Sequence, residues 1–242
     1  MRNPNGLRWF FLVSSLVVLV EMSACAAVGA LPLGGDSWKE EVLLHDGNKI
    51  VVDRMVERGG RHEVGQKPSY KEQRLRFAMP ATNQTITWED HYSANLGQAN
   101  FLPMALDIVA GAPYLVVYPM GCLSYNKWGR PNPPYVVFQY QGKEWTRVPL
   151  HEMPAELTTP NMIFSMPDIE VEKLGTRFVS AEKIKRLIAG YQQPEYKTIL
   201  REMVKLGTEG SAVNCLEMVF YKGAWVGPGD SIGKRMKDRE SK

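Results

Sequence analysis

A series of short apolar runs separated by turn residues constrains the fold of this 242-residue chain more than any other feature. The runs come in four pairs: 41–45 with 49–54, 74–79 with 85–92, 106–109 with 114–118, and 135–140 with 144–148. Short runs that flank turn residues such as Asp46-Gly47-Asn48 are typical of β-hairpins. We therefore predict a mainly β fold, an antiparallel meander that forms a sandwich, an open barrel or a propeller-like sheet.

Alternation within the second pair predicts which side chains are buried. Successive side chains of a strand point to opposite faces of the sheet. In the run 74–79 the alternation puts Arg74 and Arg76 on the solvent face. The buried faces of the two runs carry the other alternating residues: Leu75, Phe77 and Met79 in the first, and Ile86, Trp88, Asp90 and Tyr92 in the second.

One helix is predicted in the C-terminal half, packed on the sheet. Ser180 is a favourable N-cap residue, since its hydroxyl can accept a free backbone N–H. An apolar stripe with helical spacing follows at Ile184, Leu187, Ile188 and Tyr191. Gly190 and Pro194 end the helix. Residues 196–204 and 216–221 are expected to form late strands.

The N-terminus has the layout of a secretory signal. Arg2 and Arg8 precede and flank an apolar run at 9–20, and small residues lead to Cys25. The layout resembles the bacterial lipoprotein signal, although Glu21 and Met22 depart from it. We expect residues 1–24 to be a signal peptide, Cys25 to carry lipid, and 25–37 to be a spacer.

Two alternatives to lipidation remain open from the sequence. An uncleaved anchor is disfavoured, because a bilayer-spanning helix needs about 20 apolar residues. A plain secreted form, cleaved after Ala26, would discard the cysteine. After the spacer we expect a single β-rich domain over 38–226 and a flexible basic tail over 227–242.

Charge and cysteine content limit the function classes. Without residues 1–24 the chain has 27 basic and 25 acidic side chains, which is too balanced to indicate nucleic-acid binding. Cys122 and Cys215 are then the remaining cysteines, and in an oxidising periplasm they could form one disulfide. The alternative is two buried free thiols.

Residues 121–134 form the segment with the most side chains suited to binding. Prolines at 131, 133 and 134 stiffen it, and rigid aromatic and Arg side chains often anchor interfaces. We predict a partner-binding surface made by Tyr125, Asn126, Lys127, Trp128 and Arg130. The alternative is a loop that covers an open end of the sheet, with Trp128 in the core.

Other chemistry-bearing motifs are weak. The sequence has no HExxH, Walker A or CxxC motif. Glu89 and His91 share a strand face. A pair of side chains that face solvent is a simpler interpretation than a metal site. We expect no metal, no cofactor and no catalytic residue.

Four strings, 38–47, 82–90, 125–134 and 195–202, resemble a group of uncharacterised proteobacterial envelope proteins. The resemblance implies a Gram-negative, periplasm-facing location. It implies no activity, so it carries over no functional residue.

Together these observations favour an outer-membrane lipoprotein with a non-enzymatic structural or binding role, facing the periplasm. Its expected partners are the membrane, reached through the lipid, and another envelope protein. The alternatives are an envelope hydrolase with an unrecognised active site and a surface protein derived from a phage or mobile element.

Overall fold

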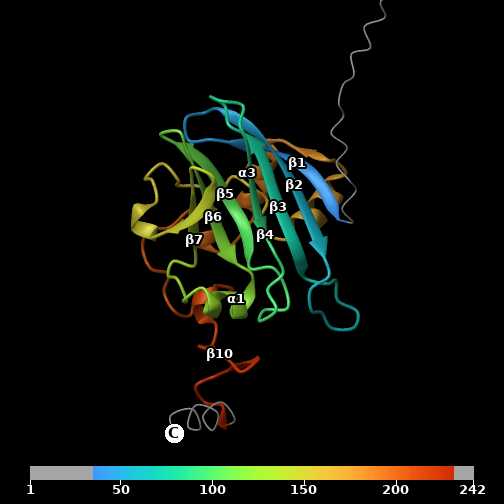
Figure 1. Ribbon diagram of the computed structural model, residues 1–242, viewed down its shortest axis with the longest axis vertical. Coiled ribbons are helices and arrows are strands. Elements are labelled where there is room, and N and C mark those ends of the chain that lie inside the picture. Colours follow the sequence, from blue (N-terminus) through green and yellow to red (C-terminus); the bar gives the residue numbers. More distant parts are fainter. Residues whose placement is uncertain (1–34, 232–242) are drawn as a thin grey trace, which may run out of the picture. The chain divides into compact units, whose positions relative to one another are not determined.

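The computed structural model describes residues 35–231 (Figure 1). The predicted signal peptide, Cys25, nearly all of the spacer and residues 232–242 of the tail lie outside the described residues. None of the helices within 35–231 has the length and hydropathy needed to cross a lipid bilayer.

The strands form two larger sheets and one short hairpin. Sheet 1 has the order β4-β3-β2-β1-β9 and consists of β1 (Asp36–Leu43), β2 (Lys49–Arg58), β3 (Tyr70–Ala78), β4 (Thr85–Asp90) and β9 (Phe178–Val179). Sheet 2 has the order β5-β6-β7-β8 and consists of β5 (Phe101–Val109), β6 (Ala112–Pro119), β7 (Val136–Gln141) and β8 (Glu144–Val148). The hairpin is β10 (Val219–Tyr221) with β11 (Ala224–Val226).

The predicted mainly β fold is confirmed: neighbouring strands are antiparallel except β9, which runs parallel to β1. The four predicted hairpins are present. In the first, Leu43 lies opposite Lys49, and the connecting turn uses Gly47 at φ +85°, a conformation that favours glycine. The described strands form no closed barrel, and the two larger sheets pack face to face as a sandwich.

Sheet 1 has one buried face and one charged face, as its alternation predicts. Leu75 and Ile86 are buried, whereas Arg74 and Glu89 pair on the outer face at 2.9 Å. The prediction that Tyr92 is buried is wrong. Its side chain is 46% exposed, because β4 ends at Asp90 and the alternation ends with it.

Strands β5 and β6 of sheet 2 are buried on both faces and are apolar almost throughout, whereas β8 is largely exposed. Leu106, Leu115 and Val117 pack against sheet 1. Val116 and Tyr118, which alternate with them, pack against segments from the C-terminal third of the chain.

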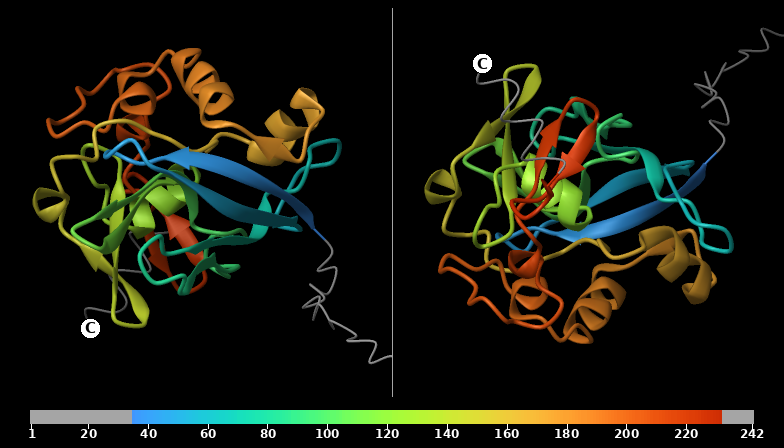
Figure 2. Two further views of the ribbon diagram at one scale, coloured as in Figure 1. Left: turned by 90° about the horizontal axis from the view of Figure 1, so that it is seen from above. Right: turned by 90° about the horizontal axis from the view of Figure 1, so that it is seen from below.

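The predicted helix is α3 (Ala181–Ala189), and its Ile184 and Ile188 are buried against sheet 1. Ser180 is the N-cap residue, but its hydroxyl makes no capping bond. The carboxylate of Glu41 on β1 accepts the Ala181 N–H instead, at 3.2 Å. In both views of Figure 2 the orange helical segment lies on one side of the strands.

The remaining short helices were not predicted: α1 (Gly121–Lys127), α2 (Pro167–Leu174), α4 (Pro194–Lys197) and the 3₁₀ turns Leu150–Glu152 and Ala212–Asn214. The strand predicted over 196–204 is wrong, since this stretch contains part of α4 and irregular chain. Its apolar side chains pack on sheet 2, while the Ile199 N–H bonds to the Thr158 carbonyl and the Leu200 N–H to the Tyr135 hydroxyl. The strand predicted over 216–221 is shorter and begins at Val219.

A buried ion pair fixes the strip 161–163 on sheet 1. Arg54 Nη1 donates to Glu40 Oε1 at 2.9 Å and to the Ile163 carbonyl at 2.6 Å, and Glu40 Oε2 accepts the Ile163 N–H at 3.2 Å. Both side chains are almost fully buried, and burial raises the pKa of Glu40. The strip also bonds to sheet 2, because the N–H groups of Asn161 and Met162 donate to the Met104 carbonyl.

Cys122, in α1, and Cys215 are joined as a disulfide, with 2.00 Å between their sulfur atoms and a sequence separation of 93. A loop of this length restricts the unfolded chain strongly, so we expect the bond to stabilise the fold by about 4–5 kcal/mol. Reductant should therefore lower the melting temperature markedly, as measured by circular dichroism. The Cys122→Ala/Cys215→Ala variant should melt at the lower temperature with or without reductant. Identical melting of oxidised and reduced wild type would contradict this prediction.

Candidate functional site

The segment predicted to bind a partner begins with a helix rather than a loop. Residues 121–127 form α1, and Tyr125 lies in the core at 2% exposure. The Arg130 guanidinium lies over the Tyr125 ring, 5.0 Å from its centre. This cation–π contact uses both side chains within the chain.

Asn126 and Arg130 hold the C-terminal segment beside the disulfide. Asn126 Nδ2 and Arg130 Nη1 both donate to the Leu216 carbonyl, at 2.9 and 3.1 Å. Arg130 Nη2 donates to the Cys215 carbonyl at 2.7 Å, and Asn126 Oδ1 accepts the Met218 N–H at 2.8 Å. These bonds satisfy backbone groups that no strand pairs, so the two side chains act as internal connectors.

Lys127 and Trp128 contact the other side of α1. Lys127 Nζ donates to Asn100 Oδ1 at 2.9 Å and to Ser93 Oγ at 2.6 Å. The Trp128 ring packs 4.6 Å from that of Phe101, between the ring centres. All five predicted binding residues therefore have partners inside the chain. This arrangement also fits the alternative interpretation, in which the segment covers an open end of the sheet.

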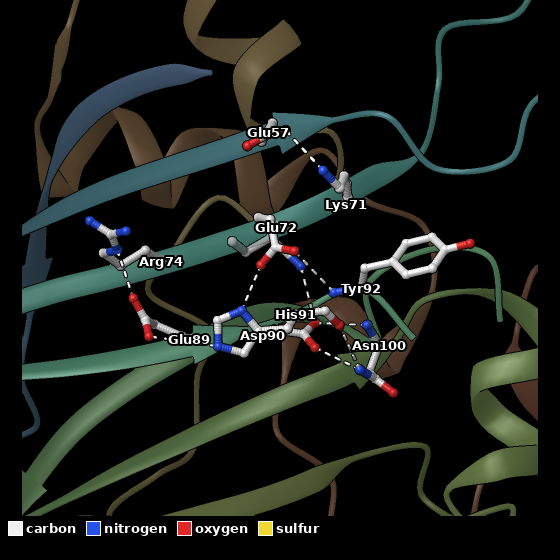
Figure 3. Close-up of polar contacts among 10 residues, drawn as sticks. Glu57, Lys71, Glu72, Arg74, Glu89, Asp90, His91, Tyr92 and Asn100 are labelled. Atoms are coloured by element: carbon white, nitrogen blue, oxygen red, sulfur yellow. Dashed lines mark hydrogen bonds and ion pairs between the residues drawn. The ribbon is translucent and has the colours of Figure 1, made fainter. Parts of the chain in front are cut away.

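The polar network around β3 and β4 is shown in Figure 3. His91 Nδ1 lies 2.6 Å from Glu72 Oε2, and its Nε2 lies 3.7 Å from Glu89 Oε2. The buried Asp90 accepts the N–H groups of Asn100 and Phe101, each at 2.8 Å, and so ties β4 to β5. Within residues 35–231 no group of three His, Cys, Asp or Glu side chains is placed to hold a metal ion.

The most chemically distinctive site is a pocket of about 380 Å³ at the seam between the sheets. It lies among the end of β1, β5, α3 and the segment 156–161. Apolar side chains form much of its lining: Leu43, Leu44, Ala105, Leu157, Pro160 and Ile184. Polar side chains also line it: His45, Asp107, Glu156, Thr158, Thr159, Asn161, Glu182 and Lys185.

A histidine oriented by a buried carboxylate lies in this pocket. His45 Nδ1 is 2.8 Å from Asp107 Oδ1, and Asp107 Oδ2 accepts the His45 backbone N–H at 3.0 Å. The Asp107 side chain is 7% exposed and that of His45 is 27% exposed. Because the carboxylate accepts the Nδ1 proton, Nε2 is left for a ligand, as acceptor in the neutral ring and as donor in the charged ring.

The Asp107 hydrogen bond raises the pKa of His45, and Glu156 adds a smaller contribution in the same direction. Asp107 is itself held in place, because its Oδ1 also accepts the Ile108 N–H at 2.8 Å. The pair thus provides a fixed imidazole that carries positive charge at mildly acidic pH.

Asn161 joins the two strands that carry the pair. Its Nδ2 donates to the Leu43 carbonyl of β1 at 2.9 Å and to the Leu106 carbonyl of β5 at 2.8 Å. Its Oδ1 accepts the Leu106 N–H at 2.9 Å. One side chain therefore sets the spacing between His45, which follows Leu44 after β1, and Asp107, which follows Leu106.

A second cavity, of about 440 Å³, lies beside α2. Val171 is the one large apolar side chain among the residues that line it, and its buried Asp168 is already bound by Arg58 at 2.7 Å. It offers little apolar contact area, so the pocket at the seam is the better ligand site.

Sequence reasoning missed this pocket, since His45 and Asp107 are 62 positions apart and each belongs to an ordinary strand end. One available signal was Asp107, a carboxylate in an otherwise apolar strand. A buried charge of this kind needs a partner.

Comparison with known proteins leaves the site to be interpreted from its geometry. No family model matches the chain, and no match was found among curated proteins or solved structures.

Replacing Asp107 by Asn should lower the pKa of His45, because the charged acceptor is lost. Since the folded pKa of His45 is raised, its contribution to stability is complete below about pH 6.5 and is lost as pH rises through the folded value. NMR titration of the imidazole signals measures the pKa directly. Glu72→Gln is the matched control: it should lower the pKa of His91 and leave that of His45 unchanged. An unchanged His45 titration in folded Asp107→Asn would contradict the assignment.

Proposed function

We propose that this protein binds a small, partly apolar ligand in the pocket at the seam, with His45 as its hydrogen-bonding anchor. The observation that carries the proposal is the imidazole held by a buried carboxylate within a largely apolar lining. Ligand sites combine apolar walls with a few fixed polar groups, and their volumes are about 300–1,000 Å³.

A binding role fits the geometry better than the alternative, hydrolysis. A histidine oriented by an aspartate is two-thirds of a nucleophilic triad, and the Thr158 and Thr159 hydroxyls line the same pocket. Among the described residues, however, no Ser, Thr or Cys side chain hydrogen-bonds to Nε2 of His45. Hydrolysis therefore remains the second candidate, and it would require His45 to activate water.

We further propose that the protein is a lipoprotein of the cell envelope that faces the periplasm. The support is the signal-like N-terminus ending at Cys25 and the resemblance to envelope proteins. The pairing of Cys122 with Cys215 suits an oxidising compartment. The lipid would hold the binding domain at the surface of the outer membrane.

The pocket can be tested by blocking its mouth without disturbing the core. Thr159 is exposed and lines the pocket, so Thr159→Trp should fill it and abolish binding of small amphipathic fragments. His45→Gln should weaken fragments that accept a hydrogen bond by about tenfold, the value of one charge-assisted bond. Chemical-shift perturbation measures both effects. Thr85→Trp, at an exposed position on β4, is the matched control and should bind as wild type does. Fragments that perturb no pocket residue would contradict the proposal.

Lipidation can be tested on the natural protein. Each buried CH₂ contributes about 0.8 kcal/mol, so two or more acyl chains on Cys25 should hold the protein on membranes. Cys25→Ser should release it into the soluble fraction. Intact mass spectrometry of the wild type should show a lipid-modified N-terminus at Cys25, and an unmodified mature N-terminus would refute the anchor.

A further inference from the structure

We infer that the ligand of this pocket is a zwitterion with an apolar body, of the class of apolar amino acids and dipeptides. The inference rests on the proposed function and goes beyond it by naming the ligand chemistry. It is carried by two charged side chains of opposite sign that line the pocket, Glu156 and Lys185.

These two side chains come from different elements, and the charge of one of them, Glu156, also acts at longer range on His45. Lys185 belongs to α3, and Glu156 precedes Leu157 in the segment that forms another wall. Both are exposed, and neither makes a hydrogen bond or ion pair with another described residue. Glu182, which also lines the pocket, differs: its carboxylate pairs with Lys49 at 2.9 Å.

Glu156 and Lys185 line one pocket and form no ion pair with each other, so neither charge is neutralised by the other. A ligand with an ammonium group and a carboxylate can meet Glu156 with the first and Lys185 with the second. A ligand with a single charge would leave one of the two unmatched.

The rest of the lining suits the same class of molecule. Asp107 is already paired with His45, and Glu182 with Lys49, so the site has no large excess of either sign. Leu44, Leu157 and Ile184 provide apolar contact for the body of the ligand. A volume of about 380 Å³ is at the small end of the range for ligand pockets, which limits the ligand to a small molecule.

The experiment compares three peptides by isothermal titration calorimetry on the folded protein: the dipeptide Leu-Leu, its N-acetyl derivative and its C-terminal amide. The acetyl group removes the ammonium charge, and the amide removes the carboxylate. We expect Leu-Leu to bind about tenfold more tightly than either blocked form. Since both protein charges are exposed and screened, a larger preference is not expected.

Two variants assign each preference to its side chain. Glu156→Gln should abolish the preference for Leu-Leu over the acetylated form and keep the preference over the amide. Lys185→Gln should do the reverse. Lys183→Gln on the same helix and Glu144→Gln on β8 do not line the pocket, so they should retain both preferences.

The outcomes separate this inference from the proposed function. If the three peptides bind equally, or if none binds while neutral or singly charged fragments bind in a manner blocked by Thr159→Trp, the ligand class is wrong and the pocket still binds ligands. If no peptide or fragment binds at all, both the inference and the proposed function are overturned.

Discussion

The buried pair of Glu40 and Arg54 is the interaction on which the arrangement of the two sheets depends. Taking two charges out of water costs about as much as their attraction returns, so such a pair adds little net stability. Its effect here is positional, because both partners also bond the backbone of Ile163. The strip 161–163 is thereby fixed on sheet 1, and from there it bonds to Met104 and Leu106 of sheet 2.

The pocket is a consequence of that seam. Asn161 satisfies backbone groups of β1 and β5 that have no neighbouring strand at this point, and so it holds the two strand ends together. His45 and Asp107 are carried on those ends. Because α3 and the segment 156–161 approach the same corner from the other side, the apolar side chains there enclose a cavity and are not fully packed against one another.

The segment 121–134 shows how a binding-like composition can serve the interior. Its aromatic and cationic side chains suggested an interface, but here they connect α1 to Asn100 and to the chain after Cys215. A C-terminal region with few strands leaves many backbone carbonyls unpaired. Arg and Asn side chains supply the missing donors, and the disulfide keeps the two segments adjacent.

The sequence by itself determined the hairpins, the alternation of sheet 1 and helix α3, because these follow from local periodicity and turn chemistry. It left open whether Cys122 and Cys215 pair, and the structure brings them together. Tertiary structure decided the rest. The stretch 196–204 lacks a neighbouring strand and therefore packs on sheet 2 without extending it. The contact between His45 and Asp107 exists because the strip 161–163 joins two strands that are far apart in the chain. The hydrophobic pattern of a sequence predicts single strands and helices, but it does not predict which distant strands lie side by side.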